Sequence, residues 1–235
     1  MIQPLIITID GPAGAGKSTV AQKLAECLGL TYVDSGATYR AAALKVLEAG
    51  VSPEDERAVA EVVARTEIRF TTDGFESRLL LDGRDVSEKI RVPEVTLAAA
   101  KVSRLPEVRE KLVGLQRSLA RGRGVVMEGR DIGTVVFPTA SLKVFLKADP
   151  EERARRRLKD EKEKGRQATL EQTAYQIGRR DQLDAERKIS PLVAAPDAVQ
   201  IDSTHLTADQ VVDRIVELAR ERKLIPERVR VKGKG

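Results

Sequence analysis

Residues 11–19 read Gly11-Pro12-Ala13-Gly14-Ala15-Gly16-Lys17-Ser18-Thr19, and the first eight fit the pattern G-x-x-x-x-G-K-[ST] without a mismatch. Glycines let a backbone wrap around a polyphosphate with its amide N–H groups pointing inward. A helix that begins near Lys17 adds the positive end of its dipole. The stretch therefore predicts a phosphate loop, in which Lys17 neutralises the β- and γ-phosphates of a nucleotide and Ser18 ligates Mg²⁺.

The flanking residues favour this interpretation over a chance glycine-rich turn. Leu5–Asp10 is almost continuously apolar, as expected of a strand buried on both faces of a parallel sheet. Apolar residues recur at helical spacing from Val20 to Leu28, and Gly29 stands where a C-cap glycine belongs. Thr31–Val33 reads as a second strand, before an Ala-rich helix that runs to about Gly50. This alternation of strand and helix predicts an α/β fold.

The middle of the chain breaks the alternation. Ile68–Thr71 and Ser77–Leu81 are β-like, with turn signals at Asp73-Gly74 and Asp82-Gly83. They predict a small antiparallel insertion between about residues 67 and 91. Helical patterning follows from residue 93 to about 120, and Pro106 is expected to break it or to start a new helix.

Apolar strands return later and restore the parallel sheet. They cover residues 125–127, 142–146 and 198–201, and two polar helices, 150–164 and 169–186, separate the last two. A final amphipathic helix includes Val211 to Ala219, and the basic tail after it is expected to be loosely ordered. The predicted fold class is an α/β phosphate-loop NTPase-type parallel sheet flanked by helices, with a small antiparallel β insertion and a short helical lid.

Composition excludes several classes of protein. The 235 residues suffice for one α/β domain with an insertion, and 41% hydrophobic with 33% charged residues is a globular composition. The single Cys27 excludes a disulfide framework and fits a reducing compartment, so a cytoplasmic protein is expected. No apolar run approaches about 18 residues, so no membrane span is expected. One histidine, His205, cannot build a Ser-His-Asp site or a histidine metal cluster.

Two further strand-end turns carry charged residues. Residues 34–40 read DSGATYR, where Ser35 and Arg40 could grip a second phosphorylated substrate at the carboxyl edge of the sheet. Residues 128–134 read EGRDIGT, where Arg130 could bind a phosphate and Asp131 could accept a hydrogen bond from an exocyclic amine. A plain capping turn and a structural Arg–Asp pair are the alternatives.

The two polar helices are rich in arginine. Arg180, Asp184 and Arg187 share one helix face, which is either an exposed ion-paired surface or part of a site. Four arginines at positions 153 and 155–157 follow Glu151 and Glu152, which could pair with Arg155 and Arg156. The alternative is a lid that closes arginines over a transferring phosphoryl group.

Six blocks together resemble the bacterial cytidylate kinase family: DGPAGAGKST, DSGATYRAAA, EVREKLVGLQR, EGRDIGTVVFP, LKVFLKADPEERARRR and RRDQLDAERKISPLVAA. They run from about Ile7 to Arg220 in the family's order, and GRDIGTVVFP and RRDxxD…R are specific to it. The resemblance implies transfer of the γ-phosphoryl group of ATP to CMP or dCMP with Mg²⁺, in pyrimidine nucleotide metabolism. It implies a core of residues 1–34 and 92–225, a monophosphate-binding insertion of residues 35–91, a lid of residues 150–166 and a basic tail of residues 226–235.

The resemblance also implies roles for individual residues. Those expected to hold ATP are the phosphate loop and Thr19, with Ser18 on the metal. Those expected to contact CMP are Ser35, Arg40, Arg109, Arg130, Asp131, Arg180, Asp184 and Arg187. Those expected to act on the transferring phosphoryl group are Lys17, Arg130, Arg153 and Arg157. One position departs from the family: Ala100 stands where a serine commonly binds the cytosine, so Ser103 could replace it or the discrimination against uracil could weaken.

Rival hypotheses remain open at this stage. A UMP or shikimate kinase would share the core, although a shikimate site would want a second carboxylate after Asp34, where Ser35 and Gly36 follow. The net charge of +5 and the tail residues Arg222, Lys223, Arg228, Arg230, Lys232 and Lys234 would suit a nucleic-acid-binding ATPase, but only 3% of residues are aromatic. The third hypothesis is a nucleotide sensor that binds ATP without turnover. We expect a monomer that binds ATP and CMP or dCMP, needs no nucleic acid and has no contact with a membrane.

Overall fold

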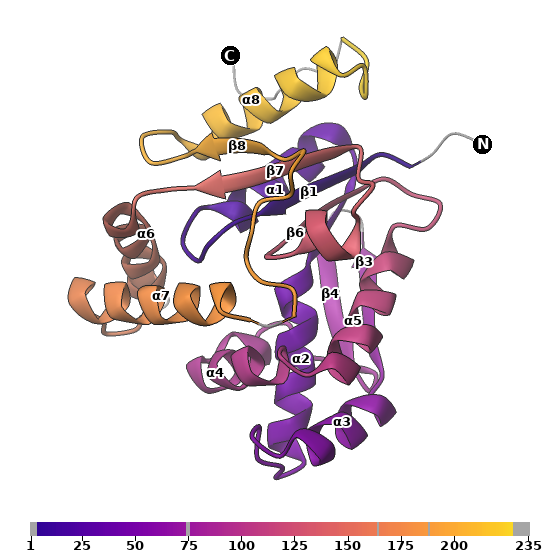
Figure 1. Ribbon diagram of the computed structural model, residues 1–235, viewed down its shortest axis with the longest axis vertical. Coiled ribbons are helices and arrows are strands. Elements are labelled where there is room, and N and C mark those ends of the chain that lie inside the picture. The colour runs from indigo at the N-terminus through magenta and orange to yellow at the C-terminus, as the bar shows by residue number, and fades with distance from the viewer. Residues whose placement is uncertain (1–3, 74–75, 164, 188, 228–235) are drawn as a thin grey trace. The chain divides into compact units, whose positions relative to one another are not determined.

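A five-stranded parallel sheet carries the phosphate loop. The computed structural model describes residues 4–73, 76–163, 165–187 and 189–227 (Figure 1). The sheet has the order β2-β6-β1-β7-β8, and its strands are β1 (Ile6–Asp10), β2 (Thr31–Asp34), β6 (Val125–Gly129), β7 (Leu142–Lys147) and β8 (Val199–Asp202). β1 pairs in parallel with both β6 and β7, and β7 with β8. The predicted parallel sheet and its strands are confirmed.

The described chain packs as two compact units, Met1–Tyr32 with Gly122–Gly235, and Val33–Arg121. In the first unit, helices α1 (Lys17–Leu28) and α8 (Ala208–Glu221) cover the sheet and enclose an apolar core between them and the strands (Figure 1). Gly29 ends α1 in the left-handed region, at φ 64°, and its N–H bonds the helix's last carbonyls as predicted. This core holds β1 and α1 rigidly at both ends of the phosphate loop.

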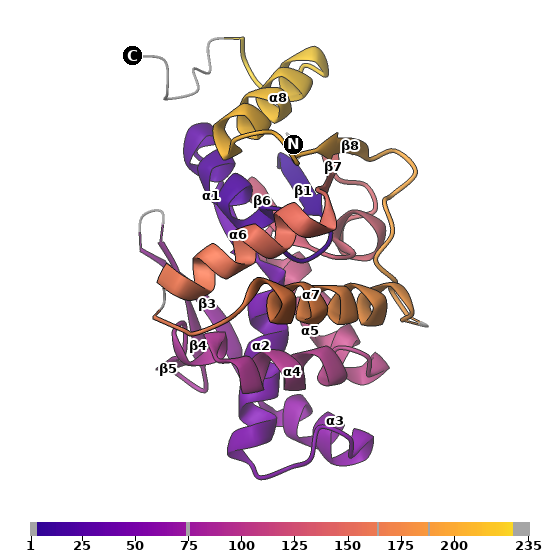
Figure 2. The same ribbon diagram turned by 90° about the vertical axis from the view of Figure 1, so that its left-hand side faces the viewer.

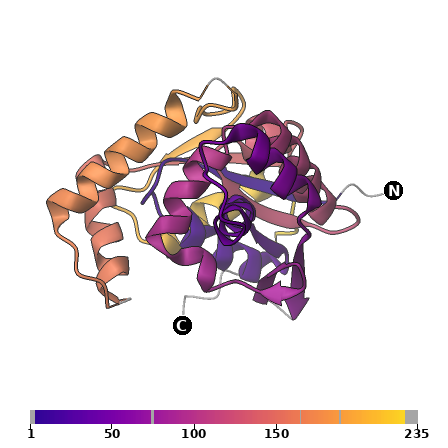
Figure 3. The same cartoon turned by 90° about the horizontal axis from the view of Figure 1, so that it is seen from below.

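Two more helices complete the first unit. α6 (Pro150–Glu163) and α7 (Leu170–Ala185) lie side by side in all three views (Figures 1, 2 and 3). Thr169 caps the start of α7 with a capping box. Its hydroxyl accepts from the backbone N–H of Gln172, and the side-chain oxygen of Gln172 accepts from the backbone N–H of Thr169. Between β6 and β7 the chain makes one π-helical turn, η2 (Ile132–Val136), which the sequence reading did not anticipate.

The second unit contains an antiparallel sheet and four α-helices. The sheet has the order β3-β4-β5, from β3 (Ile68–Asp73), β4 (Glu76–Leu81) and β5 (Arg84–Asp85). The helices are α2 (Ser35–Glu48), α3 (Glu56–Arg65), α4 (Pro93–Val102) and α5 (Pro106–Leu119), with a short 3₁₀ turn η1 (Lys89–Arg91). An apolar core of alanine and valine from α2 and its neighbours holds the unit together.

The antiparallel insertion and the helix break at Pro106 are confirmed. Asp82 and Gly83 both have positive φ, of 47° and 79°, as a tight hairpin turn between β4 and β5 requires. Gly74 of the other expected turn lies outside the described residues, as does the end of the basic tail from residue 228. The second unit extends to Arg121, beyond the expected end of the insertion at residue 91, because α4 and α5 belong to its core.

None of the helices in the described part of the chain combines the length and the apolar character that a membrane span needs.

Candidate active site

The phosphate loop runs from the end of β1 into the first turn of α1. Gly14 and Gly16 occupy the left-handed region, at φ 75° and 88°. A Cβ on Gly14 would come within 2.7 Å of the backbone oxygen of Arg153, so α6 packs directly on the loop. A larger residue at this position would strain the backbone and push α6 away.

Lys17 is buried beside the loop. Its Nζ donates to the backbone oxygen of Pro12 at 2.7 Å, and only 6% of the residue is exposed. Burial, followed by the positive charge of Arg130, lowers the pKa of Lys17 from 10.5 to about 7, although the Glu128 carboxylate opposes the shift. Arg180 lowers this pKa further. Positive charge is therefore concentrated around the loop, where a polyphosphate would be stabilised.

Asp10, the last residue of β1, is a buried carboxylate that the sequence reading did not single out. It accepts hydrogen bonds from the N–H groups of Ile132 and Gly133, at 2.9 and 2.7 Å, and thereby fixes the turn after β6. Burial raises its pKa to about 6, although both amides oppose the shift. Its signal in the sequence is an acidic residue at the end of a buried strand, next to the first glycine of the loop.

Asp184 is the centre of an arginine cluster. Its Oδ2 accepts from Nε of Arg130 at 2.9 Å, its Oδ1 pairs with Arg187, and Arg180 lies 3.9 Å away. Only 1% of the Asp184 side chain is exposed, so this helix face is not the exposed surface that was one of the alternatives. Burial acts to raise the pKa of Asp184, but Arg130, Arg187 and Arg180 together hold it below its ordinary value.

Of the arginines on α6, Arg153 contacts the phosphate loop. Its Nη1 donates to the backbone oxygen of Ala13 at 3.1 Å and pairs with Asp181 of α7. Arg156 bonds the predicted Glu152 and also donates to the backbone oxygens of Ser203 and Thr204. Arg157 pairs with Glu161, and 43% of its side chain is exposed. The predicted pair of Arg155 with Glu151 is also present.

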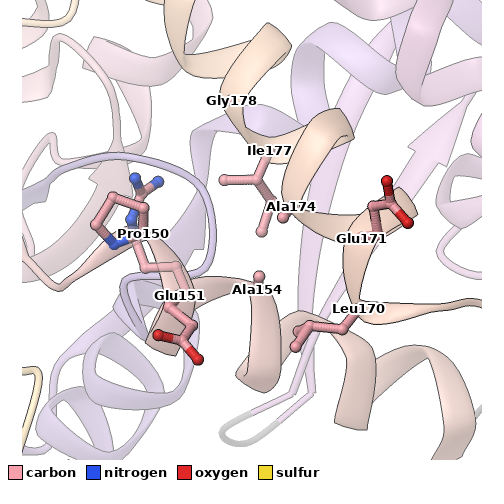
Figure 4. Close-up of a pocket in the computed structure, with 9 residues that line it drawn as sticks. Pro150, Glu151, Ala154, Leu170, Glu171, Ala174, Ile177 and Gly178 are labelled. Carbon is pink, nitrogen blue, oxygen red and sulfur yellow. The ribbon is translucent and has the colours of Figure 1, made fainter.

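The contact between α6 and α7 is apolar. Ala154 of α6 and three residues of α7, Leu170, Ala174 and Ile177, line a groove between the two helices, as Figure 4 shows. The ion pair of Arg153 with Asp181 joins the same two helices.

In the second unit, the start of α2 holds two of the expected substrate residues. Asp34 caps the helix by accepting from the N–H of Ala37 at 3.1 Å, and its other oxygen accepts from Nη2 of Arg40 at 2.6 Å. Burial acts to raise the pKa of Asp34, but Arg40 outweighs it and the pKa is lowered. Ser35 is buried, and its carbonyl accepts from the Thr38 hydroxyl at 2.6 Å. The capping turn that was one alternative for residues 34–40 is present, but the sequence did not indicate that Asp34 also pairs with Arg40.

Arg109 of α5 is buried as well. Its Nη1 donates to the backbone oxygen of Ser103 at 3.2 Å, and its guanidinium lies 5.5 Å from the centre of the Tyr39 ring. The Ser103 hydroxyl donates to the backbone oxygen of Ala100 at 3.2 Å and is itself buried. A hydroxyl therefore stands one turn from Ala100, but it is bonded within its own helix end.

The first unit thus brings together Lys17, Arg130, Arg180, Asp184 and Arg187, with Asp131 buried on the same turn as Arg130. The second unit holds Ser35, Arg40 and Arg109. Among the described residues, no group of three or more histidines, cysteines or carboxylates could hold a metal ion by itself. A phosphate loop after the central strand of a parallel sheet indicates a phosphate-loop nucleotide-binding enzyme, and the arginines beside its lysine suit the transfer of a phosphoryl group.

Comparisons with known proteins give the particular family. The family model for cytidylate kinase matches residues 7–221. A cytidylate kinase of Caldanaerobacter subterraneus subsp. tengcongensis is 53% identical over 215 residues, which cover 92% of this chain and 94% of that protein. One of Geobacillus kaustophilus is 48% identical over 222 residues, covering 94% and 99%. The chain belongs to the cytidylate kinase family and is an ATP-dependent nucleoside-monophosphate kinase.

A solved structure supports the fold alone. An uncharacterized protein from Eubacterium ventriosum ATCC 27560 aligns with a TM-score of 0.51 at 12% identity, over 92% of this chain and 98% of that one.

Proposed function

We propose that the residues gathered around Lys17 carry out the reaction of this family on CMP or dCMP, which become CDP or dCDP while ATP becomes ADP. The observation that carries this assignment is the burial of Lys17 beside Arg130 and Arg180, at the end of a glycine-rich loop. Buried positive charges repel one another, and an anionic nucleotide relieves that repulsion. The phosphate loop and Thr19 would hold ATP, with Lys17 on its β- and γ-phosphates.

Mg²⁺ would accompany ATP, and the chain fits this mode of binding. Mg²⁺ keeps several waters and is commonly held by one or two protein oxygens plus substrate phosphates, so a preformed cage is not needed. Ser18 is exposed at the first turn of α1, directly after Lys17, and its hydroxyl would be the protein ligand. When bound, the ion would neutralise charge on the β- and γ-phosphates.

The remaining chemistry is alignment and neutralisation of charge. The acceptor is already a phosphate anion, so no strong general base is required, and positioning supplies much of the rate. Lys17 and Arg130 would stabilise the charge on the transferring phosphoryl group. Arg153 and Arg157 of α6 would act from the lid, which would also exclude the water that otherwise hydrolyses ATP.

Eight residues would contact CMP. Ser35, Arg40 and Arg130 would hold the phosphate, and Arg180 and Asp184 the sugar. Arg109 and Asp131 would read the cytosine, with Arg187 near base and phosphate. Ala100 offers no polar group to the base, so Asp131 would carry most of the discrimination against uracil.

The test is the base preference of Asp131→Ala. We expect KM for CMP to rise by roughly tenfold or more and kcat/KM for CMP to approach that for UMP, since a lost polar contact weakens rejection of the wrong base. Asp160→Asn, at an exposed position of α6, is the control and should keep the wild-type preference. Equal losses for CMP and UMP in Asp131→Ala would contradict the base-reading role.

We expect the enzyme to act as a monomer in the cytoplasm and without nucleic acid. The single Cys27 suits a reducing compartment. The part of the basic tail that suggested a nucleic-acid partner, from residue 228 onward, lies outside the described residues. RNA binding that weakens with salt and disappears when the residues after Arg222 are deleted would revive the nucleic-acid hypothesis.

A further inference from the structure

One carboxylate of α7 touches the phosphate loop without being among the proposed CMP or ATP contacts. Oδ1 of Asp181 accepts from the backbone N–H of Ala13 at 3.1 Å, and Oδ2 pairs with Nη1 of Arg153. The same Nη1 donates to the backbone oxygen of Ala13 at 3.1 Å. Both backbone polar groups of Ala13 are therefore held from α6 and α7, which follow the loop by more than 130 residues.

The same helix face also carries the centre of the arginine cluster. Asp184 follows Asp181 by three residues, which places the two carboxylates about one turn apart on one side of α7. Asp184 holds Arg130 and Arg187. One rigid turn of helix thus connects the loop proposed for ATP with arginines proposed for CMP.

We propose that Asp181 is a positioning residue that couples the binding of the two nucleotides. ATP in the loop acts on the backbone of Ala13, and Asp181, which accepts from the Ala13 N–H, transmits that effect to α7. α7 in turn presents Asp184 with Arg130 and Arg187 in the arrangement that takes CMP. This inference rests on the proposed assignment of the cluster to CMP. Because coupling free energies are reciprocal, each nucleotide must tighten the other by the same factor.

The contacts of Asp181 are strong enough to carry such coupling. Its side chain is 19% exposed and that of Arg153 only 9%, so water screens the pair weakly. Hydrogen bonds with one ionised partner are about twice as strong as neutral ones. Arg153 and Asp181 therefore connect α6 and α7 to each other as well as to the phosphate loop.

The experiment is calorimetric titration of CMP into the full chain, with and without a saturating ATP analogue whose β,γ-bridge is a methylene group. For the wild type we expect the analogue to lower the Kd of CMP by about fivefold or more, within the usual range of coupling. In Asp181→Asn, which keeps the shape and removes the charge, this ratio should fall to near one. The Kd of CMP alone should stay within about twofold of wild type.

Two further variants and one measurement make the result decisive. Asp160→Asn makes the same chemical change at an exposed position of α6 and should keep the wild-type ratio. Asp181→Glu restores the charge and should recover part of the coupling. Thermal melting of Asp181→Asn in the absence of nucleotide checks that the variant is folded under the conditions of the titration.

An unchanged ratio in Asp181→Asn, or a wild type whose ratio is already one, would overturn the proposal. An Asp181→Asn variant whose Kd for CMP alone rises tenfold or more would also overturn it, because a ratio near one would then reflect a general structural loss. Failure of the CMP assignment would show separately, as an Asp184→Asn variant with unchanged affinity for CMP.

Discussion

The phosphate loop and the start of α2 both follow a buried parallel strand, and both are proposed to bind phosphate, yet they are stabilised differently. The start of α2 is self-contained, since Asp34 caps the helix and holds Arg40 within seven residues. The phosphate loop is held by residues far along the chain, including Arg153, Asp181 and Ser203, whose hydroxyl donates to the backbone oxygen of Ala15. A substitution at the start of α2 is therefore expected to act locally. A substitution in the phosphate loop also affects its contacts with α6, α7 and the residue that follows β8.

The largest expected effect comes from Lys17→Met at the phosphate loop. Loss of this charge should lower kcat by roughly 10²–10³-fold or more, as loss of other groups that stabilise a charged transition state does. The same variant should be more stable than wild type without nucleotide, because it removes a buried and repelled ammonium. Steady-state kinetics and thermal melting measure the two effects.

The pH dependence of that stability gain follows from the pKa of Lys17, which is about 7 in the folded protein and ordinarily 10.5. Between these two pH values the unfolded chain binds more protons at Lys17 than the folded protein does. The free energy by which Lys17 destabilises the folded protein therefore falls as pH rises. The advantage of Lys17→Met should therefore be greatest below pH 7 and should shrink toward pH 10. An advantage that grows with pH would contradict the burial of a charged Lys17.

A smaller effect is expected from Asp184→Asn, which breaks the arginine cluster. Removing one partner of a buried ion pair leaves uncompensated charge and typically costs about 3–5 kcal/mol. Urea unfolding at pH 7 should show a loss of this order, while Asp160→Asn should stay within about 0.5 kcal/mol of wild type. A loss as small as that of the control would mean that the cluster is solvated in solution.

The smallest effect is expected from Gly36→Ala at the start of α2. The new Cβ would lie 3.0 Å from Nη1 of Arg40 and 3.1 Å from Oδ1 of Asp34, so it would disturb their pair. We expect KM for CMP to rise by roughly three- to tenfold, with KM for ATP unchanged, because a weakened charged contact costs about 1 kcal/mol.

Gly114→Ala in α5 is the matched control for that variant. Its Cβ would meet nothing within 4 Å, so the change should stabilise the helix slightly and leave both KM values unchanged. A rise in KM for ATP in Gly36→Ala would show that the start of α2 is not self-contained, and would remove the contrast with the phosphate loop.

The sequence was informative where a signal is local. The phosphate loop, the C-cap at Gly29, the turn at Asp82-Gly83 and the helix start at Pro106 each depend on residues within a few positions of one another. Helix α3 was not predicted although it carries local signals of this kind, since Asp55 caps its start and Val59 and Val63 are spaced one turn apart.

The connections within the site depend on partners that are distant in the chain. Asp10 bonds amides more than 120 residues away, and Asp181 bonds Ala13 across 168 residues. No spacing pattern records such pairs, so the sequence predicted charged residues at strand ends but not which of them would meet. Asp184 shows the consequence, since the sequence left open whether its helix face is exposed or part of a site, and the structure buries it among three arginines.

The most direct test of the whole account is ADP formation from Mg-ATP with CMP, dCMP, UMP, AMP, GMP and shikimate at equal concentration. The account predicts strong turnover with CMP and dCMP and much weaker turnover with UMP, which would show that Asp131 and Arg109 suffice without a hydroxyl at Ala100. Turnover with UMP equal to that with CMP would contradict the proposed base reading. ATP binding without phosphorylation of any acceptor would contradict the assignment of the protein as a kinase.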